Sequence, residues 1–118
     1  MVTLVLGASI HPSRYSYKAI QLLRQHDHEV IAVGRDDGEV HGVSILQTIP
    51  KHIVVDTVTL YVNPTHQIMY YNALIALNPR RIIFNPGTEN DELMQLALKN
   101  DIEVEIACTL VLLNTGQY

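Results

Sequence analysis

The sequence predicts a three-layer α/β domain, a Rossmann-like doubly wound parallel sheet of about five strands. Short apolar runs rich in β-branched residues alternate along the chain with segments of helical periodicity. Strands that alternate with helices pair in parallel through right-handed crossovers, and the helices then cover both faces of the sheet. The composition fits such a covered sheet, because 47% of the residues are hydrophobic and only 17% are charged. With 118 residues, positions 1–118 are expected to fold as a single domain.

Five apolar runs are the predicted strands, and most of them are separated by helical patterns. The first run leads into Gly7, Ala8 and Ser9 and then into a helix with an inward face of alanine, isoleucine and leucine. A polar turn, His26-Asp27-His28, joins that helix to the second strand. The predicted strands are residues 2–6, 29–33, 56–62, 80–84 and 102–106.

Capping residues mark the helices in the second half of the chain. Thr65 is expected to be the N-cap of the helix after the third strand, and Asn78-Pro79 ends that helix. Thr88 with Asp91 resembles a capping box, so the next helix is expected to begin after Thr88.

Three segments have weaker patterns. Residues 34–42 are polar and contain Gly38 and Gly42 as turn residues. Residues 43–50 are expected to be irregular, with at most a short turn of helix around Gln47. Residues 108–113 are expected to form a short helix or strand.

Three loops with glycine or proline are expected to meet at one edge of the sheet. They span residues 7–14, 62–65 and 85–89, and each precedes a helix. Ligands of doubly wound sheets bind outside the carboxyl ends of the strands. The small residues of the first loop allow a tight turn and a close approach, and the following helix directs its free N–H groups at that turn. The expected ligand therefore carries phosphate.

The residues around these loops leave two phosphate ligands open. Of the glycines in the dinucleotide fingerprint G-x-G-x-x-G, only Gly7 is present, since Ser9 and Pro12 occupy later positions where glycines are expected. Arg35 follows the second predicted strand and suits a phosphate on the adenosine ribose. NADP carries such a phosphate at the 2′ position and coenzyme A (CoA) at the 3′ position. Arg14 is a second candidate for phosphate binding, and His11 can donate there.

Several segments together carry a family resemblance that covers nearly the whole chain. They are Gly7-Ala8-Ser9, Pro12, Arg14-Tyr15-Ser16-Tyr17, Val43, Ile49-Pro50, Asp56-Thr57-Val58, Asn85-Pro86-Gly87-Thr88-Glu89-Asn90 and Cys108-Thr109-Leu110-Val111. With these segments the chain resembles the stand-alone CoA-binding domain proteins, which are similar to the N-terminal CoA-binding domain of the succinyl-CoA synthetase α subunit. The resemblance implies a Rossmann-like fold that binds CoA or acyl-CoA with the loops after the first four strands.

The resemblance also implies a role for particular residues. Gly7, Ala8, Ser9 and Ile10 would cradle phosphate, and Arg35 would neutralise the nucleotide end. The residues that would line the pocket are Val62, Asn63, Pro64, Asn85, Pro86 and Gly87. The chain departs from many relatives after the second strand, where it has Gly34-Arg35-Asp36 in place of an Asn-Pro pair.

The expected activity is binding without catalysis. The phosphohistidine loop of the synthetase and its nucleotide-grasp domain have no counterpart in these 118 residues. No nucleophile paired with a base is visible, and the histidines have no spacing typical of a metal site. The alternative is an NADP-binding redox protein or a fragment of an oxidoreductase. A homo-oligomer or a partner enzyme chain is compatible with either function.

Charge and composition exclude other classes of partner. The net charge of −4 argues against nucleic-acid binding, and no apolar run approaches the roughly 20 residues of a membrane span. The single cysteine, Cys108, excludes an internal disulfide and is most simply a buried structural residue. Met1 leads directly into the first predicted strand without the basic region of a signal peptide, so a cytoplasmic location is expected.

Overall fold

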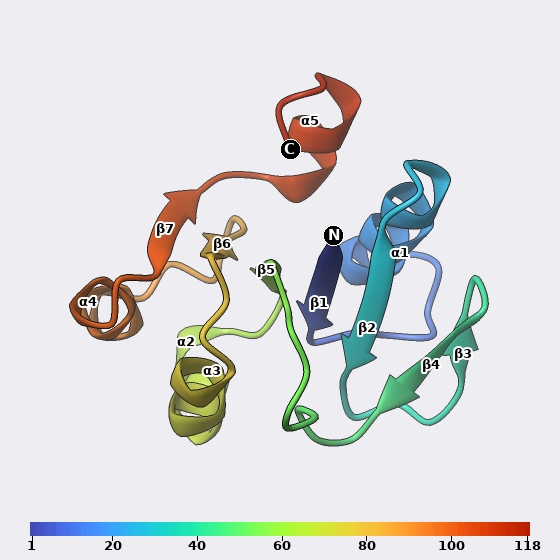
Figure 1. The fold of residues 1–118 in the computed structure, drawn as a ribbon. Helices are drawn as coiled ribbons and strands as arrows, with labels where there is room; N and C mark the ends of the chain where they lie inside the picture. Colours follow the sequence, from blue (N-terminus) through green and yellow to red (C-terminus); the bar gives the residue numbers. More distant parts are fainter.

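The computed structural model describes residues 1–118 and contains a sheet of seven strands. The strand order across the sheet is β3-β4-β2-β1-β5-β6-β7 (Figure 1). The strands are β1 (Val2–Leu6), β2 (Glu29–Val33), β3 (Glu39–Val40), β4 (Val43–Leu46), β5 (Thr57–Leu60), β6 (Arg81–Phe84) and β7 (Glu103–Ile106). All neighbouring pairs are parallel except β3 with β4, which is antiparallel. The predicted fold class is confirmed, whereas the expected number of strands was too low.

The topological switch point lies between β1 and β5. From β1 the chain moves outward to β2 and β4, and from β5 it moves outward in the opposite direction to β6 and β7. Leu6 at the end of β1 is in register with Val33 on one side and with Leu60 on the other. Without the antiparallel β3, this is the strand order of dinucleotide-binding Rossmann domains. The carboxyl ends of β1, β2 and β5 therefore meet where a ligand is expected.

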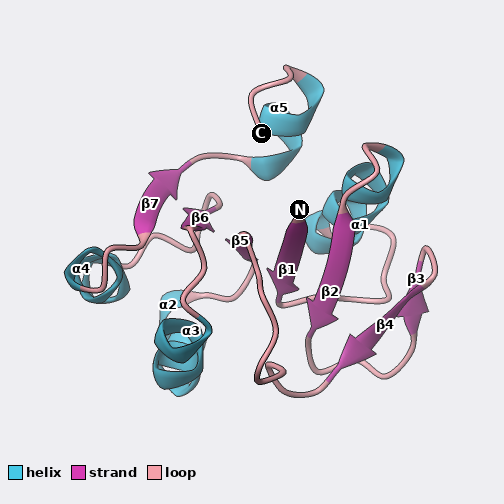
Figure 2. Cartoon of the chain, viewed as in Figure 1, coloured by secondary structure: helices cyan, strands magenta, loops and turns pink.

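Helices cover both faces of the sheet (Figure 2). The first helix, α1 (Tyr15–Gln25), and the last, α5 (Thr109–Asn114), share one face, where Val5, Ile20 and Leu113 belong to one cluster of buried side chains. The opposite face carries α2 (Pro64–Gln67), the 3-10 turn η1 (Ile68–Tyr70), α3 (Tyr71–Leu77) and α4 (Asp91–Lys99). None of these helices is long and apolar enough to cross a lipid bilayer.

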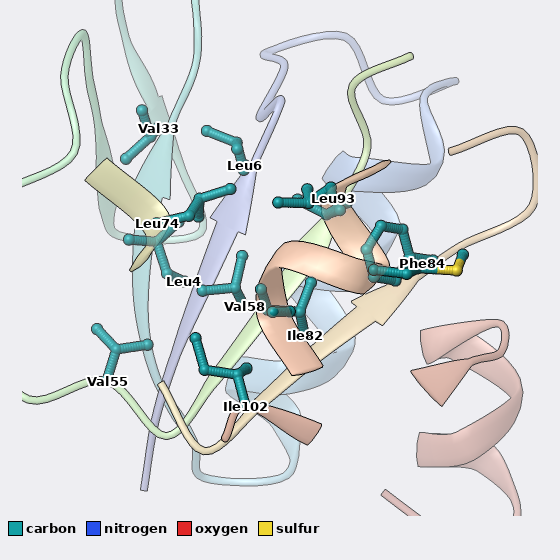
Figure 3. Packing of buried hydrophobic residues seen from close by; sticks show 13 residues of the cluster. Leu4, Leu6, Val33, Val55, Val58, Leu74, Ile82, Phe84, Leu93 and Ile102 are labelled. Carbon is teal, nitrogen blue, oxygen red and sulfur yellow. The ribbon is translucent and has the colours of Figure 1, made fainter. Parts of the chain in front are cut away.

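The larger of the two buried clusters lies between the sheet and the helices α3 and α4 (Figure 3). Leu4 and Leu6 of β1 point into it together with Leu74 and Leu93, while Val5 points into the other cluster. This alternation follows from the two-residue period of a strand. Phe84 is fully buried in the cluster, and its truncation to alanine is expected to cost about 3–5 kcal/mol of unfolding free energy.

The expectation of an irregular segment at residues 43–50 was wrong for residues 43–46 and is confirmed for residues 47–50. Val43–Leu46 is the strand β4, which pairs in parallel with β2 and in antiparallel with β3. His41 and Gly42 join β3 to β4, both with positive φ, as a two-residue hairpin turn requires. No helix forms around Gln47, and its side chain instead donates to the carbonyl of Asp36. After β4 the chain returns to β5 without a helix (Figure 1).

Two predicted N-caps are displaced by two residues each. Asn63, not Thr65, caps α2, because its side chain accepts the N–H of the third following residue at 3.1 Å. Asn90, not Thr88, caps α4 in the same way, and the hydroxyl of Thr88 donates to the carbonyl of Asn85 instead. Asn78 ends α3, as predicted, and it does so in the left-handed conformation.

Candidate functional site

A cleft of about 590 Å³ lies at the carboxyl ends of β1, β2, β5 and β6. Nine of the twelve residues predicted for the site line it, and they come from four separate loops: Gly7, Ala8, Ser9, Arg14, Arg35, Val62, Asn63, Pro86 and Gly87. Ile10, Pro64 and Asn85 are not among the lining residues. The volume falls in the range that is typical of small-molecule pockets. The fold thus brings the predicted loops together in one place.

The turn after β1 is packed against its neighbouring strands. The N–H groups of Gly7 and Ala8 both donate to the carbonyl of Val33, at 2.8 and 3.0 Å. Gly7 has φ +96°, and a Cβ atom there would lie 2.7 Å from the carbonyl oxygen of Tyr61. Glycine is required at this position by the approach of β5, and the amides of Gly7 and Ala8 are not free to bind a phosphate.

Gly34, at the end of β2, allows a second close approach. A Cβ atom at Gly34 would lie 2.3 Å from the carbonyl oxygen of Ala8, and its own N–H donates to the carbonyl of Leu46 at 2.9 Å. Its φ lies outside the left-handed region, so the contact alone requires a glycine. In the sequence Gly34 was noted only because Gly34-Arg35-Asp36 stands where many relatives have an Asn-Pro pair. No local sequence pattern could reveal its contact with Ala8.

Free backbone donors lie one step further along the first loop. The N–H of Ser9 has no partner in the chain, and neither do the N–H groups of Tyr15 and Ser16 in the first turn of α1. Arg14 occupies the N-cap position without a side-chain acceptor, and the first turn contains no acidic residue. The positive end of the α1 dipole therefore faces the cleft without a compensating group of its own.

A carboxylate of the chain already contacts this loop. The N–H of Ile10 donates to Oδ2 of Asp36 at 3.0 Å, so this amide is not free to bind a phosphate. The bond from Ile10 is the main cause that lowers the pKa of Asp36, followed by a bond from the Ser9 side chain and the nearby charges of His11 and Arg14. Asp36 is thus held ionised beside the proposed phosphate-binding loop.

Two arginines at the cleft lack an acidic partner. The ion pairs of the chain are those of Arg80 and Arg81, so neither Arg14 nor Arg35 is paired with a carboxylate. Nη2 of Arg35 lies 3.5 Å from Nδ1 of His66, a residue of α2 that also lines the cleft and that the sequence did not single out for this site. The lining of the cleft thus carries two arginines against one carboxylate, Asp36, in a chain whose net charge is −4.

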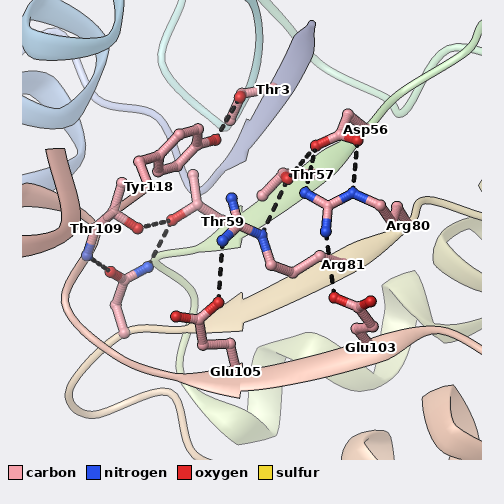
Figure 4. A network of polar contacts seen from close by, with 11 residues as sticks. Thr3, Asp56, Thr57, Thr59, Arg80, Arg81, Glu103, Glu105, Thr109 and Tyr118 are labelled. Carbon is pink, nitrogen blue, oxygen red and sulfur yellow. Dashed lines mark hydrogen bonds and ion pairs between the residues drawn. The ribbon is translucent and has the colours of Figure 1, made fainter. Parts of the chain in front are cut away.

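Asn85 is buried behind the cleft and holds the sheet to α5. Its side-chain amide donates to the hydroxyl of Thr59 at 2.7 Å and to the carbonyl of Leu60 at 2.8 Å. Its side-chain oxygen accepts the N–H of Thr109 at 2.9 Å, and the hydroxyls of Thr59 and Thr109 bond to each other (Figure 4). Asn85 is therefore placed to position its loop, while Pro86 and Gly87 line the cleft.

Gln67 fixes the two loops that form the wall opposite α1. It is fully buried, and its amide donates to the carbonyls of Val62 and Thr88, each at 2.8 Å. Its side-chain oxygen accepts from Asn90 at 2.9 Å. Because Val62 and Thr88 both line the cleft, this one side chain sets the separation of the two loops.

Two further side chains that could take part in chemistry, Tyr61 and Cys108, lie near the site. The hydroxyl of Tyr61 is buried and has no hydrogen-bond partner, and burial raises the pKa of Tyr61 to about 12. Cys108 is half-buried at the N-cap of the short helix α5 and does not line the cleft. No group of three or more His, Cys, Asp or Glu side chains is placed to hold a metal ion.

A cleft with free backbone donors and unpaired arginines, at the switch point of such a sheet, is typical of Rossmann-like nucleotide-binding domains. The chain belongs to the CoA binding domain family, which residues 2–114 match. No curated protein is significantly similar to it.

Solved structures are similar over nearly the whole chain. A crystal structure of an uncharacterized protein has 50% sequence identity and a TM-score of 0.96, with 99% of this chain and 97% of that chain covered. A protein from Thermus thermophilus has 21% identity and a TM-score of 0.87, with 99% and 90% covered. A hypothetical protein from Pyrococcus horikoshii has 22% identity and a TM-score of 0.83, with 92% and 78% covered. The last two likenesses concern the fold alone.

Proposed function

We propose that the protein binds CoA or an acyl-CoA in this cleft. The observation that carries the proposal is the pair of unpaired arginines, Arg14 and Arg35, beside free N–H groups in a member of the CoA binding domain family. Anionic ligands are attracted both by such cations and by the start of a helix. Because the chain as a whole has a net charge of −4, the excess of positive charge at the cleft is local and does not reflect a basic protein.

The pyrophosphate is proposed to lie over the first loop, near the N–H groups of Ser9, Tyr15 and Ser16. This differs from a cradle made by every amide from Gly7 to Ile10, because Val33 and Asp36 already accept three of those donors. Of those four amides only that of Ser9 is free, and the free N–H groups of Tyr15 and Ser16 in the first turn of α1 are proposed to complete the binding of the pyrophosphate.

The two ends of the ligand are proposed to lie on either side of this loop. The adenosine phosphate would meet Arg35 beyond β2, and the pantetheine would run between Val62 and Asn63 on one loop and Pro86 and Gly87 on the other. Charge-assisted bonds are stronger than neutral ones, so the contact with Arg35 is expected to contribute most to discrimination between phosphorylated ligands.

We place the protein among binding modules without catalysis. The hydroxyl of Ser9 accepts the backbone N–H of His11 at 3.1 Å and bonds to the carboxylate of Asp36, but to no imidazole. Because the pKa of Asp36 is lowered, this carboxylate is a weak base and a poor activator of a hydroxyl. Cys108 lies outside the lining of the cleft. Incubation with acetyl-CoA or succinyl-CoA is therefore expected to give ligand exchange without thioester hydrolysis. Hydrolysis above background that is lost on replacement of Ser9 would overturn this part of the proposal.

Calorimetry with four ligands tests the binding proposal. CoA is expected to bind more tightly than dephospho-CoA, and NADP and NAD are expected to bind more weakly than CoA. Arg35→Ala should weaken CoA by about 1.5–3 kcal/mol and dephospho-CoA far less. Arg24→Ala removes the same charge from an exposed position in the last turn of α1 and should leave both affinities unchanged. Tighter binding of NADP than of CoA would favour the alternative redox function, and equal losses for both CoA forms would remove Arg35 from this role.

A further inference from the structure

We propose that His66 and Arg35 together form a two-sided clamp for the terminal phosphate of the adenosine, and that His66 makes this recognition dependent on pH. The inference rests on the proposed function and deepens it, because it assigns a specificity-determining residue. His66 was not among the residues predicted from the sequence for this site. It enters the argument through its place in the cleft and its contact with Arg35.

The two side chains approach from opposite sides of the switch point. Arg35 lies in the loop after β2, and His66 lies in α2, which follows β5. Nη2 of Arg35 and Nδ1 of His66 are 3.5 Å apart, and both residues line the cleft. The backbone of His66 is fixed by Asn63, whose side-chain oxygen accepts its N–H at 3.1 Å. The imidazole is thus presented from an anchored turn.

The chemistry of the contact between Arg35 and His66 favours an anion that binds to both side chains. A guanidinium has donors only, so an imidazole that bonds to it must use a ring nitrogen without a proton. Neither side chain has a carboxylate partner. A doubly protonated imidazole would repel Arg35 in the empty cleft, but a phosphate bound beside the two side chains would accept from both. Phosphate binding and proton uptake by His66 therefore favour each other.

The other charged groups of the cleft lie in or against the first loop and take no part in the contact between Arg35 and His66 that couples phosphate binding to proton uptake. Arg14 and His11 line the first loop, and Asp36 is held against the N–H of Ile10 in the same loop. His66 has no acidic residue on its own short helix. The terminal phosphate of CoA itself titrates near pH 6, so the pH dependence of CoA binding must be compared between protein variants rather than judged in one protein.

The test is the ratio of affinities for CoA and dephospho-CoA, measured by calorimetry between pH 5.5 and pH 8.5. His66→Gln keeps a hydrogen-bonding side chain but cannot gain a charge. His26→Gln changes an exposed histidine at the far end of α1 and is the matched control. Thermal unfolding of each variant shows whether it is folded over this range.

In the wild type and in His26→Gln the ratio is expected to rise as the pH falls from 8 to 6. In His66→Gln that rise should be smaller by about three- to tenfold, the range expected for an exposed and partly screened ionic contact. Calorimetry in two buffers of different ionisation enthalpy should show proton uptake that is larger in the wild type than in His66→Gln. Equal rises in the two proteins would overturn the clamp while the proposed function stands. If neither CoA form binds at any pH, the proposed function is wrong and the clamp falls with it.

Discussion

The replacement Gly34→Ala tests how the site is built, because it adds one methyl group between two backbone segments. The new Cβ would lie 2.3 Å from the carbonyl oxygen of Ala8 and 3.1 Å from its amide nitrogen. Side chains almost never approach other atoms below 3.0 Å, so the end of β2 or the turn after β1 must move by about 0.7 Å, the difference between these limits. Neither neighbour is a flexible side chain that could rotate away.

The energetic cost follows from this contact and from the hydrogen bonds around it. Overpacking usually costs about 1–3 kcal/mol, and a contact between two backbones is expected at the upper end, near 3 kcal/mol. The same movement would stretch the bond from the Gly34 N–H to Leu46 and the two bonds from Gly7 and Ala8 to Val33. The backbone conformation of Gly34 adds no further cost, since its φ is not left-handed.

Gly42→Ala is the matched control, since Gly42 has the left-handed backbone that Gly34 lacks and lacks the close contact that Gly34 has. Gly42 has φ +83°, and a Cβ atom there would have no neighbour within 4 Å. It should therefore cost only the left-handed penalty of about 1–2 kcal/mol. Urea unfolding measures both stabilities, and calorimetry with CoA measures the site. Gly34→Ala should lose more stability than Gly42→Ala and should also weaken CoA, whereas Gly42→Ala should bind normally. A smaller loss for Gly34→Ala, or unchanged binding, would refute the argument that this contact sets the first loop.

Three further predictions concern polar groups. Asp36→Asn keeps an acceptor for Ile10 but removes a negative charge from the cleft, so CoA should bind about two- to fivefold tighter in low salt, with a smaller gain at 0.5 M salt; an unchanged affinity in calorimetry contradicts this. Gln67→Leu leaves the carbonyls of Val62 and Thr88 without their donor and should lower the free energy of unfolding in urea by about 2–4 kcal/mol. An unchanged free energy of unfolding, as expected if water takes the place of the amide, would contradict this. The pKa of Asp56 is lowered, first by its bond from Arg80, so it stabilises the fold above its unfolded pKa of about 3.9 and this stability is lost as the pH falls through the folded pKa. Asp56→Asn should therefore cost about 1 kcal/mol at pH 7, with a difference from wild type that disappears in acid; a constant difference down to pH 2 would contradict the linkage.

The sequence predicted the elements whose pattern is local. The run from Val2 to Leu6 is fully apolar at its centre, and the boundaries of β1 and β2 were correct to the residue. Asn78 was correctly placed as the end of a helix because the left-handed conformation and the following proline are both local properties. These elements needed no information about distant parts of the chain.

The failures share a different origin. Strand β4 has only two buried side chains, Val43 and Ile45, and it is defined by its pairing with β2 rather than by a long apolar run. Thr65 and Thr88 have the residue type of an N-cap, but Asn63 and Asn90 take that role. Because both kinds of residue can cap a helix, the choice depends on where the preceding strand ends, which the sequence alone places only to within a few residues.

Charge shows most clearly what the sequence could not predict. Arg80 and Arg81 are adjacent in the sequence and stand at the beginning of β6, where Asp56, Glu103 and Glu105 neutralise them (Figure 4). Their role is structural. Arg80 bridges Asp56 and Glu103, which lie at the starts of β5 and β7, and Arg81 is buried and stacks over the ring of Tyr118.

Arg14 and Arg35 lie at the opposite end of the strands and have no acidic partner. In the sequence each of these four arginines is simply a cation near a strand or a loop, and the fifth, Arg24, is exposed in the last turn of α1 away from the cleft. Only the fold separates the two that are neutralised within the chain from the two that are left to attract an anion. Asp36, the one carboxylate among the lining residues, accepts the N–H of Ile10 and forms no ion pair with either arginine. The lack of an ion pair at Arg14 and Arg35 is therefore the strongest physical reason to place the phosphates of a ligand at this end.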